Sequence, residues 1–178
     1  TADHGPQPVR WIGRRRFAAD RLAAHDARLM PVRIKAGALG PNMPSADLTV
    51  SPQHRILLRS RIAQRMFGTD EILVAAKQLL QIEGVERATD LAEVEYVHIL
   101  FDRHEVVRAN GTATESLYLG PQALAALPAP AVGEILAIFP ELAARSHAPE
   151  GARMLASGRK ARKLAQRHAQ NGQPLVLA

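Results

Sequence analysis

The sequence predicts a mainly β domain of short strands, followed by short helices toward the C-terminus. Two observations predict the strands: brief runs of β-branched and aromatic residues, and frequent interruption of these runs by Gly, Pro, Asn and Asp. A third observation predicts the helices, because apolar residues after Gly120 recur at spacings of three and four. The expected strands lie at residues 9–12, 31–37, 48–50, 55–58, 71–76, 94–101 and 104–111.

Helices are expected at residues 121–127 and 130–145, each with a Pro near its start, and Pro140 interrupts the second. A helical turn or two is also expected within residues 16–29 and 75–82.

The C-terminal residues are expected to form a linker and a basic tail. Residues 146–158 resemble a linker, and residues 158–172 have a Gly at each side and helix formers between them. Only Leu164 and a few alanines are available for burial there, which predicts a solvated, partly frayed helix. We therefore expect one domain over residues 1–145, with residues 146–178 as the tail.

Composition limits the classes of protein. With 178 residues and 47% apolar residues, the chain is long enough for one domain with a core, and no run is long enough to span a membrane. The absence of Cys excludes disulfides, thiolate metal sites and a cysteine nucleophile within these residues. Because the chain begins with Thr1 inside a loop-like segment, we expect a fragment or processed product.

The positive charge is confined to the tail. The formal net charge is +6, and residues 151–178 contain six Lys or Arg and no acidic residue. The first 150 residues are therefore neutral overall, so the charge favours an anionic partner only for the tail.

The segment SPQH separates two short strand-like runs and carries the first candidate site. Pro52 favours an extended Ser51 followed by a turn, so that the Ser51 hydroxyl and the His54 imidazole converge on one point. Such a pair suits binding of a carbonyl or an amide. The alternative is an ST-turn with a purely structural role.

The segment at residues 94–104 carries the second candidate site. If it runs as one regular strand, alternation places one set of side chains on the same face: Tyr96, His98, Leu100, Asp102 and His104. The opposite face is expected to belong to the core: Val97, Ile99 and Phe101. A face with two histidines and an aspartate is either exposed to water or a functional site. Asn110 and Gly111 are expected to form a tight turn after it.

Together these segments resemble the Hint family, the autoprocessing domains of Hedgehog proteins and inteins, and in particular its bacterial branch. The resemblance covers about residues 1–145 in order. It is carried by PVRIKAGALGPNMPSADLTVSPQHRILL, EILVAAKQLL and VEYVHILFDRHEVVRANGTATESLYLG, and DHGPQPVRWIGRRRF and ESLYLGPQALAALPAPAVGEILAIFPEL fit the same branch. It implies a compact horseshoe of short strands with pseudo-twofold symmetry.

The resemblance also implies an activity. Members of this family attack their own upstream peptide bond with a Cys or Ser at the first position, giving a thioester or ester. Ser51 and His54 match the family's Thr-x-x-His element, and His104 with the following Asn-Gly matches its later His-containing element. His54 would donate a proton to the leaving nitrogen and Ser51 would hold the amide or oxyanion. Asp102 would assist the nucleophile or set a histidine tautomer, with His98 in a supporting role.

Two departures from the family pattern shape this expectation. The segment with the first-position nucleophile is absent, so these residues alone are not expected to perform the first step. No His-Asn pair followed by a nucleophile ends the domain, so we expect cleavage without splicing, with water or another nucleophile as acceptor. The substrate is then the flanking upstream polypeptide, no cofactor or metal is expected, and the resemblance implies an extracellular or cell-surface bacterial protein.

Three other interpretations remain open. A metal-dependent hydrolase is one, because four residues are candidate ligands for zinc: His54, His98, Asp102 and His104. A binder of anions through the basic tail is another, although nucleic acid is not expected because the tail lacks aromatic residues for base stacking. The third is a degenerate Hint domain without activity.

Overall fold

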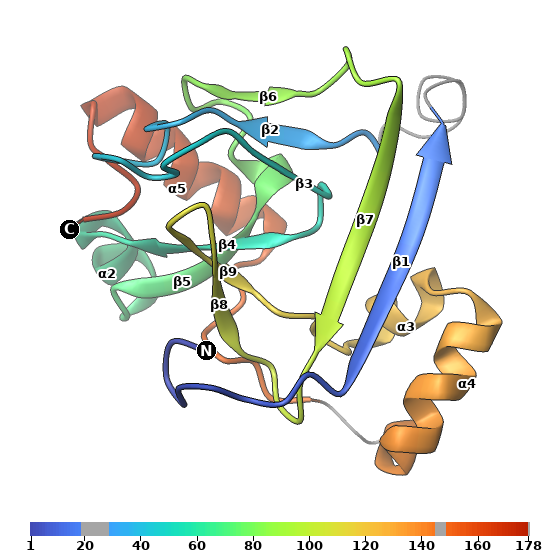
Figure 1. Ribbon diagram of the computed structural model, residues 1–178. Helices are drawn as coiled ribbons and strands as arrows, with labels where there is room; N and C mark the ends of the chain where they lie inside the picture. Colours follow the sequence, from blue (N-terminus) through green and yellow to red (C-terminus); the bar gives the residue numbers. More distant parts are fainter. Residues whose placement is uncertain (19–28, 145–148, 178) are drawn as a thin grey trace.

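The computed structural model describes residues 1–18, 29–144 and 149–177, and within them the chain is mainly β, as predicted. Nine strands form three antiparallel sheets in this part of the chain, and β1 (Trp11–Ala18) pairs with β7 (Glu93–Leu100) as a long ribbon at one side (Figure 1). The three-stranded sheet has the order β3 (Leu48–Val50), β2 (Val32–Ile34), β6 (Val85–Arg87). The four-stranded sheet has the order β5 (Glu71–Ala75), β4 (Arg55–Arg59), β9 (Thr112–Glu115), β8 (Val106–Ala109).

All seven strands expected from the sequence are present, six of them with shifted ends and β3 with the expected bounds, whereas β6 and β9 are not predicted. The helical turn expected within residues 75–82 is a single 3-10 turn at Ala76–Gln78. Of the helix expected within residues 16–29, residues 16–18 belong instead to β1, and residues 19–28 lie outside the described residues.

The strands β8 and β9 form a hairpin that fixes the register of the later site. Asn110 and Gly111 both have positive φ, 47° and 77°, which is the conformation that a two-residue hairpin turn requires. The expected tight turn is therefore present. Pairing from this turn places Val106 opposite Glu115, and one bridge, Ile56 to Thr114, joins β9 to β4.

The main core lies between the three-stranded sheet, strands β4 and β5, and the helices α2 (Arg61–Phe67) and α5 (Gly158–Asn171). Fully buried side chains from these elements and from the turn after β5 fill it: Ile34, Ile56, Ile72, Leu79 and Leu164. The core thus joins residues as far apart in the sequence as Val32 and Leu175.

The helix α2 is not predicted from the sequence, although its two ends have ordinary signals. The Ser60 hydroxyl accepts a hydrogen bond from the Ala63 amide at 3.0 Å and so caps the N-terminus. Gly68 ends the helix with a φ of 78°, which Gly adopts without strain because it lacks a Cβ. The helix reverses the chain between the paired strands β4 and β5.

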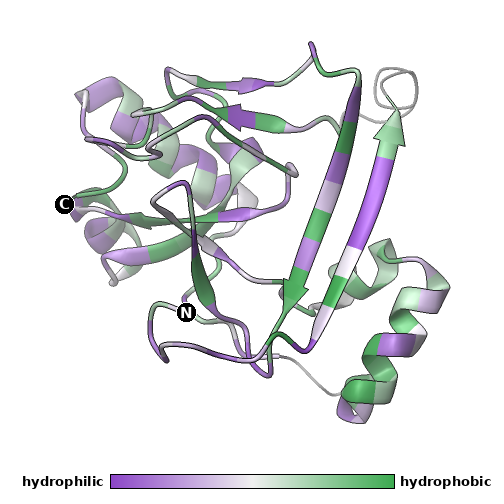
Figure 2. Cartoon of the chain, in the orientation of Figure 1, coloured by the Kyte–Doolittle hydropathy of each residue, from purple (hydrophilic) through white to green (hydrophobic). Residues whose placement is uncertain are grey.

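The helix α5 lies where the sequence predicts a helix, but the expectation that it is solvated is wrong. One side of it is buried in the main core: Ala161, Leu164, Ala165 and His168. These positions are separated by three, one and three residues, so they form one stripe, and small alanines allow the helix to approach the sheet closely. Figure 2 shows the resulting mixture of hydrophobic and hydrophilic residues along α5.

A second apolar cluster joins the ribbon to α3 (Pro121–Ala126) and α4 (Ala129–Ile138), which confirms the two predicted helices. Its buried members are Leu100, Leu119 and Ile135, and α4 is mainly hydrophobic in Figure 2. A 3-10 turn at Pro140–Ala143 follows α4, so Pro140 interrupts the helix as expected. Among the helices of the described residues, none combines the length and apolar character needed to cross a membrane.

Candidate functional site

Ser51 and His54 lie together in the turn between β3 and β4. The His54 amide donates to the Ser51 carbonyl at 3.0 Å and to the Ser51 hydroxyl oxygen at 3.2 Å, which is the pattern of an ST-turn. Within the described residues the Ser51 hydroxyl donates to no partner, and neither nitrogen of the His54 ring is hydrogen-bonded. One turn therefore carries both groups, and neither donates a hydrogen bond within the described residues.

The carboxylate next to this turn belongs to Glu115, at the end of β9. Its Oε1 accepts the backbone N–H of Arg55 at 2.9 Å, and its Oε2 pairs with Arg55 Nη1 at 2.9 Å. The bridge between β4 and β9 brings Glu115 to Arg55, which directly follows His54. Only 7% of the Glu115 side chain is exposed, so a buried charge lies beside the candidate pair.

Asp102 lies outside this cluster. The strand β7 ends at Leu100 and the chain then bends, so strand alternation does not continue to residue 104 as predicted. The Asp102 side chain is 56% exposed and pairs with Arg10 at 3.4 Å. Asp102 is also not among the charged groups that shift the pKa of His54.

The prediction that Val97 belongs to the core is also wrong, because Val97 is 52% exposed. The ribbon has only two strands, and Val97 lies opposite Arg14 on its outer face. Ile99 is half-buried, and Phe101, which follows the strand, is buried as expected.

His104 contacts Glu115 directly. Its side chain is only 2% exposed, and its Nε2 lies 3.3 Å from Glu115 Oε2. The other ring nitrogen, Nδ1, accepts a hydrogen bond from the Ala152 amide at 3.0 Å. The ring also packs against Tyr118, with 5.0 Å between the ring centroids.

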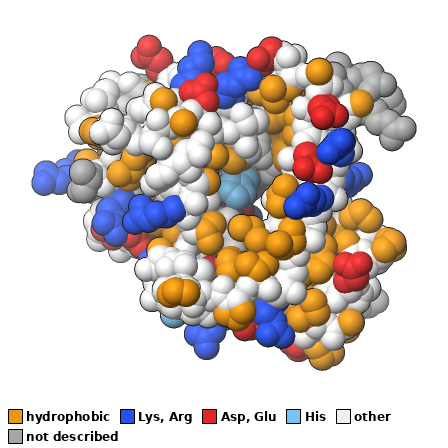
Figure 3. Space-filling view, in the orientation of Figure 1, with side chains coloured by type: hydrophobic (Ala, Val, Ile, Leu, Met, Phe, Trp, Pro, Cys, Tyr) orange, Lys and Arg blue, Asp and Glu red, His pale blue; other side chains and the backbone are white. Residues whose placement is uncertain are grey.

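His98 lies on β7 near His54, and its ring forms no hydrogen bond within the described part of the chain. Burial lowers its pKa below the ordinary value of 6.5. The structure thus brings Ser51, His54, His98 and His104 into one region. In the space-filling view a histidine side chain is visible near the centre of the face shown, with some apolar side chains beside it (Figure 3).

The electrostatics of the cluster keep His54 neutral and Glu115 charged near neutral pH. Burial lowers the pKa of His54 and outweighs the opposing effect of Glu115, and the neighbouring His98 and Arg55 lower it further. Burial alone would raise the pKa of Glu115, but the contact with His104 and the charge of Arg55 lower it overall. A neutral imidazole and an ionised carboxylate therefore lie close enough to interact electrostatically.

Three histidines with lowered pKa values predict that stability depends on pH. The three are His54, His98 and, in the main core, His168, and burial is the largest cause of the lowered pKa of each. Below about pH 6.5 the unfolded chain binds protons that the folded chain does not, so the free energy of unfolding should fall as pH decreases. Denaturant unfolding at about pH 7.5 and about pH 5 measures this effect. Equal stability at both values would contradict the burial of neutral histidines.

The donor geometry gives no support to a metal-dependent hydrolase. Across residues 1–18, 29–144 and 149–177, no group of three or more His, Cys, Asp or Glu side chains is arranged to hold a metal ion. Asp102 is turned to solvent, and His104 already has both ring nitrogens near protein partners.

The fold and this cluster define a mainly β domain whose candidate active groups lie in a turn beside a buried carboxylate. The family model described as the Hint domain matches residues 1–121 of the 178, which includes every residue of the cluster except Ala152. No curated protein and no solved structure matches the chain. The chain therefore belongs to the Hint domain family, and it is in general terms a self-processing domain.

The sequence analysis did not assign Glu115 or Arg55 to the site. A signal for Glu115 was present in the Asn-Gly turn, because counting outward from residues 110 and 111 pairs residue 106 with residue 115. Glu115 then falls beside the start of the predicted strand that begins with His104. Arg55 carries no comparable signal, since its contact with Glu115 depends on pairing between β4 and β9.

Proposed function

We propose that this Hint domain cleaves the peptide bond at its upstream edge through an acyl shift to a Cys or Ser side chain of the flanking segment. The observation that carries the proposal is that one turn holds the Ser51 hydroxyl and a neutral His54 imidazole, and within the described residues neither group donates a hydrogen bond. An amide resists attack because its resonance must be lost and its nitrogen must be protonated before it leaves. The Ser51 hydroxyl suits the first requirement, because it can stabilise the carbonyl oxygen as resonance is lost, and His54 suits the second, because it can protonate the nitrogen.

In the proposed step the nucleophile forms a C–S or C–O bond to the scissile carbonyl carbon, and the C–N bond breaks. The thiol or hydroxyl proton passes to the unprotonated nitrogen of His54, and the same nitrogen then gives this proton to the leaving amine. The Ser51 hydroxyl donates to the carbonyl oxygen as negative charge develops there. Glu115, rather than Asp102, supplies the carboxylate that stabilises the transient positive charge on His54.

The resulting ester or thioester is transferred to water or to another nucleophile, so the product is cleaved and not spliced. The support is the sequence, in which Asn110 precedes a Gly and follows Ala109 instead of a His. Asn110 also lies in the hairpin turn, where its side-chain amide donates to the Asp47 carbonyl at 2.9 Å. It is thereby held in a structural role.

The test is to express the longer protein in which this chain follows its natural upstream flank. Intact mass measurement and N-terminal sequencing then locate any break. The proposal expects a break at the upstream edge of the domain that forms without an added protease. A longer protein that folds and stays intact would support an inactive domain instead.

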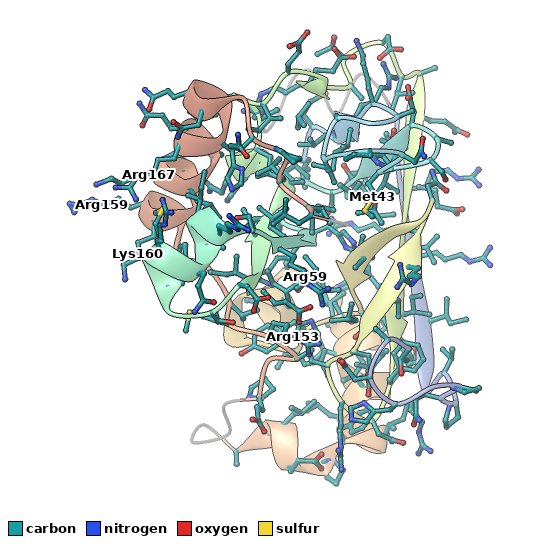
Figure 4. The ribbon with its side chains drawn as sticks, turned by 90° about the vertical axis from the view of Figure 1, so that its left-hand side faces the viewer. Met43, Arg59, Arg153, Arg159, Lys160 and Arg167 are labelled. Atoms are coloured by element: carbon teal, nitrogen blue, oxygen red, sulfur yellow. The ribbon has the colours of Figure 1, made fainter. Side chains whose placement is uncertain are left out.

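A second candidate function, binding of a polyanion, is favoured by the exposed side of α5. Besides Arg162, whose Nη1 donates to Gln78, six exposed cations lie on α5 and the adjacent α2: Arg61, Arg65, Arg159, Lys160, Lys163 and Arg167. None of the six forms an ion pair in the described part of the chain. Figure 4 shows Arg159, Lys160 and Arg167 projecting from α5 at one edge of the molecule. A surface hollow of about 460 Å³, lined in part by Lys77 and Arg162, adjoins the helix.

Charge reversal on α5 tests this candidate. In the variant with Lys163→Glu and Arg167→Glu, affinity for a labelled duplex DNA, used as a polyanion probe, should fall by about tenfold or more. Binding of the unmodified chain should weaken steeply with salt, since each neutralised phosphate adds about 0.9 to the slope. Deleting the whole tail is a poor test because it also removes the buried side of α5. Weak binding without salt dependence would contradict this function.

A further inference from the structure

We infer that residues 149–155, the strap, fix the tautomer of His104 and thereby orient Glu115 for the reaction. The strap lies outside residues 1–121, so the family match does not cover it. The effect of the strap on catalysis rests on the proposed function, whereas the tautomer of His104 is a property of the folded chain alone. Ala152 is on this account a positioning residue, because it acts through His104 and not on the substrate.

The strap is fastened to the body at several points along its backbone. The Tyr118 hydroxyl donates to the Pro149 carbonyl at 2.9 Å, near the beginning of the strap. The Leu73 amide of β5 donates to the Met154 carbonyl at 3.0 Å, and Leu155 forms a parallel bridge with Leu73. These contacts hold both ends, so the amide between them has a defined position.

Side chains of the strap add packing and charge to these backbone contacts. Ala152 and Leu155 pack on a small apolar cluster at the outer face of the four-stranded sheet: Leu57, Leu73 and Val106. Arg153 Nη2 pairs with Asp3 Oδ1 at 2.7 Å, and Arg153 Nε pairs with Glu71 Oε2 at 2.5 Å. The strap is thereby linked to the N-terminal segment and to β5.

The hydrogen bond from Ala152 determines which nitrogen of His104 carries the proton. A backbone N–H is only a donor, so Nδ1, at 3.0 Å from it, must be an acceptor without a proton. The proton of the neutral ring therefore lies on Nε2. That atom is buried and forms no hydrogen bond within the described residues, and Glu115 Oε2 lies 3.3 Å from it.

In this tautomer the N–H edge of His104 lies 3.3 Å from the Glu115 carboxylate, which also accepts hydrogen bonds from Arg55. With the proton on Nδ1 instead, the Nε2 lone pair would face the lone pairs of the carboxylate, and the strap amide would face a second donor. Both contacts would be unfavourable in a buried site. The strap thus selects the state of His104 in which the charge of Glu115 is held in place beside His54.

The experiment measures the tautomer in this chain, with histidine labelled by nitrogen-15 and long-range proton–nitrogen correlation spectra at neutral pH. The unmodified chain should show His104 with its proton on Nε2. Ala152→Pro removes the amide donor and should shift the ring nitrogens toward the other tautomer or a mixture. Ala152→Gly keeps the amide and should leave the tautomer unchanged. A proton on Nδ1 in the unmodified chain, or no change in Ala152→Pro, would overturn the inference.

Two further measurements cover the case in which Ala152→Pro does not fold. The Ala152 amide should exchange slowly with solvent, and Tyr118→Phe, which loosens the strap at Pro149 but keeps the ring on His104, should speed that exchange. Fast exchange in the unmodified chain would contradict the strap. In the longer protein, Ala152→Pro should slow cleavage by about tenfold or more and Ala152→Gly should not. If the tautomer is as stated but no cleavage occurs in any variant, the proposed function fails and the strap stands.

Discussion

Replacing His54 by alanine should slow cleavage of the longer protein by a factor of about 10² to 10⁴, because this is the usual contribution of a positioned acid–base group. The His54 ring forms no hydrogen bond in the described residues, so its removal leaves no internal partner unsatisfied. The fold should therefore persist while the reaction slows. The measurement is the rate of appearance of the cleaved fragment after synthesis or refolding.

The matched control is Gln53→Ala, since Gln53 is exposed and lies in the same turn. Cleavage by this variant should stay within a few-fold of the unmodified rate. The acid limb of the pH profile gives an independent check: because burial lowers the pKa of His54, the neutral form persists, and activity should decline only below about pH 6.5. A His54→Ala variant that cleaves at the unmodified rate would remove this histidine from the mechanism.

Replacing Leu164 by alanine should lower the free energy of unfolding by about 2 to 5 kcal/mol, as is usual for truncation of a buried leucine. Leu164 is fully buried in the main core, although it lies in the segment that the sequence indicates is a solvated tail. Lys163→Ala is the control, since the neighbouring side chain is exposed and should change stability by no more than about 0.5 kcal/mol. Denaturant unfolding measures both variants, and equal effects would show that α5 is not part of the core.

The strands were predictable because each is a local feature of composition. Residues 55–58 and 71–76, for example, each begin with one charged residue that is followed only by apolar residues, some of them β-branched, and each run comes after turn residues. The strand β9 was missed because the sequence TATE has only one large side chain and no apolar run. Its conformation depends on pairing with β8 and β4.

The site was predictable only where its geometry is local. Ser51 and His54 lie three residues apart in one turn, so Pro52 and the break between strands were sufficient to bring them together. Asp102 was favoured because it lies two residues from His104, but the bend after Leu100 directs it to solvent. Glu115 reaches the cluster through strand pairing, which spacing along the sequence does not indicate.

The burial of α5 was not predictable from its own composition. The helix is amphipathic, but its apolar side has one leucine and several alanines, which offer too little apolar surface to predict docking. The small side chains are, however, what lets the helix lie close to β5, α2 and the 3-10 turn at Ala76–Gln78. The buried contact between the Ser60 hydroxyl and His168 Nε2, at 2.9 Å, joins the cap of α2 to the same helix.

The most direct test of the central claim is to treat the longer protein with hydroxylamine, which attacks esters and thioesters far faster than peptide amides. If Ser51 and His54 promote an acyl shift, hydroxylamine should accelerate release of the upstream segment, which mass spectrometry should detect as its C-terminal hydroxamate. The same treatment of the His54→Ala variant should release little. Absence of the hydroxamate from the unmodified protein, or equal release from both proteins, would contradict the account.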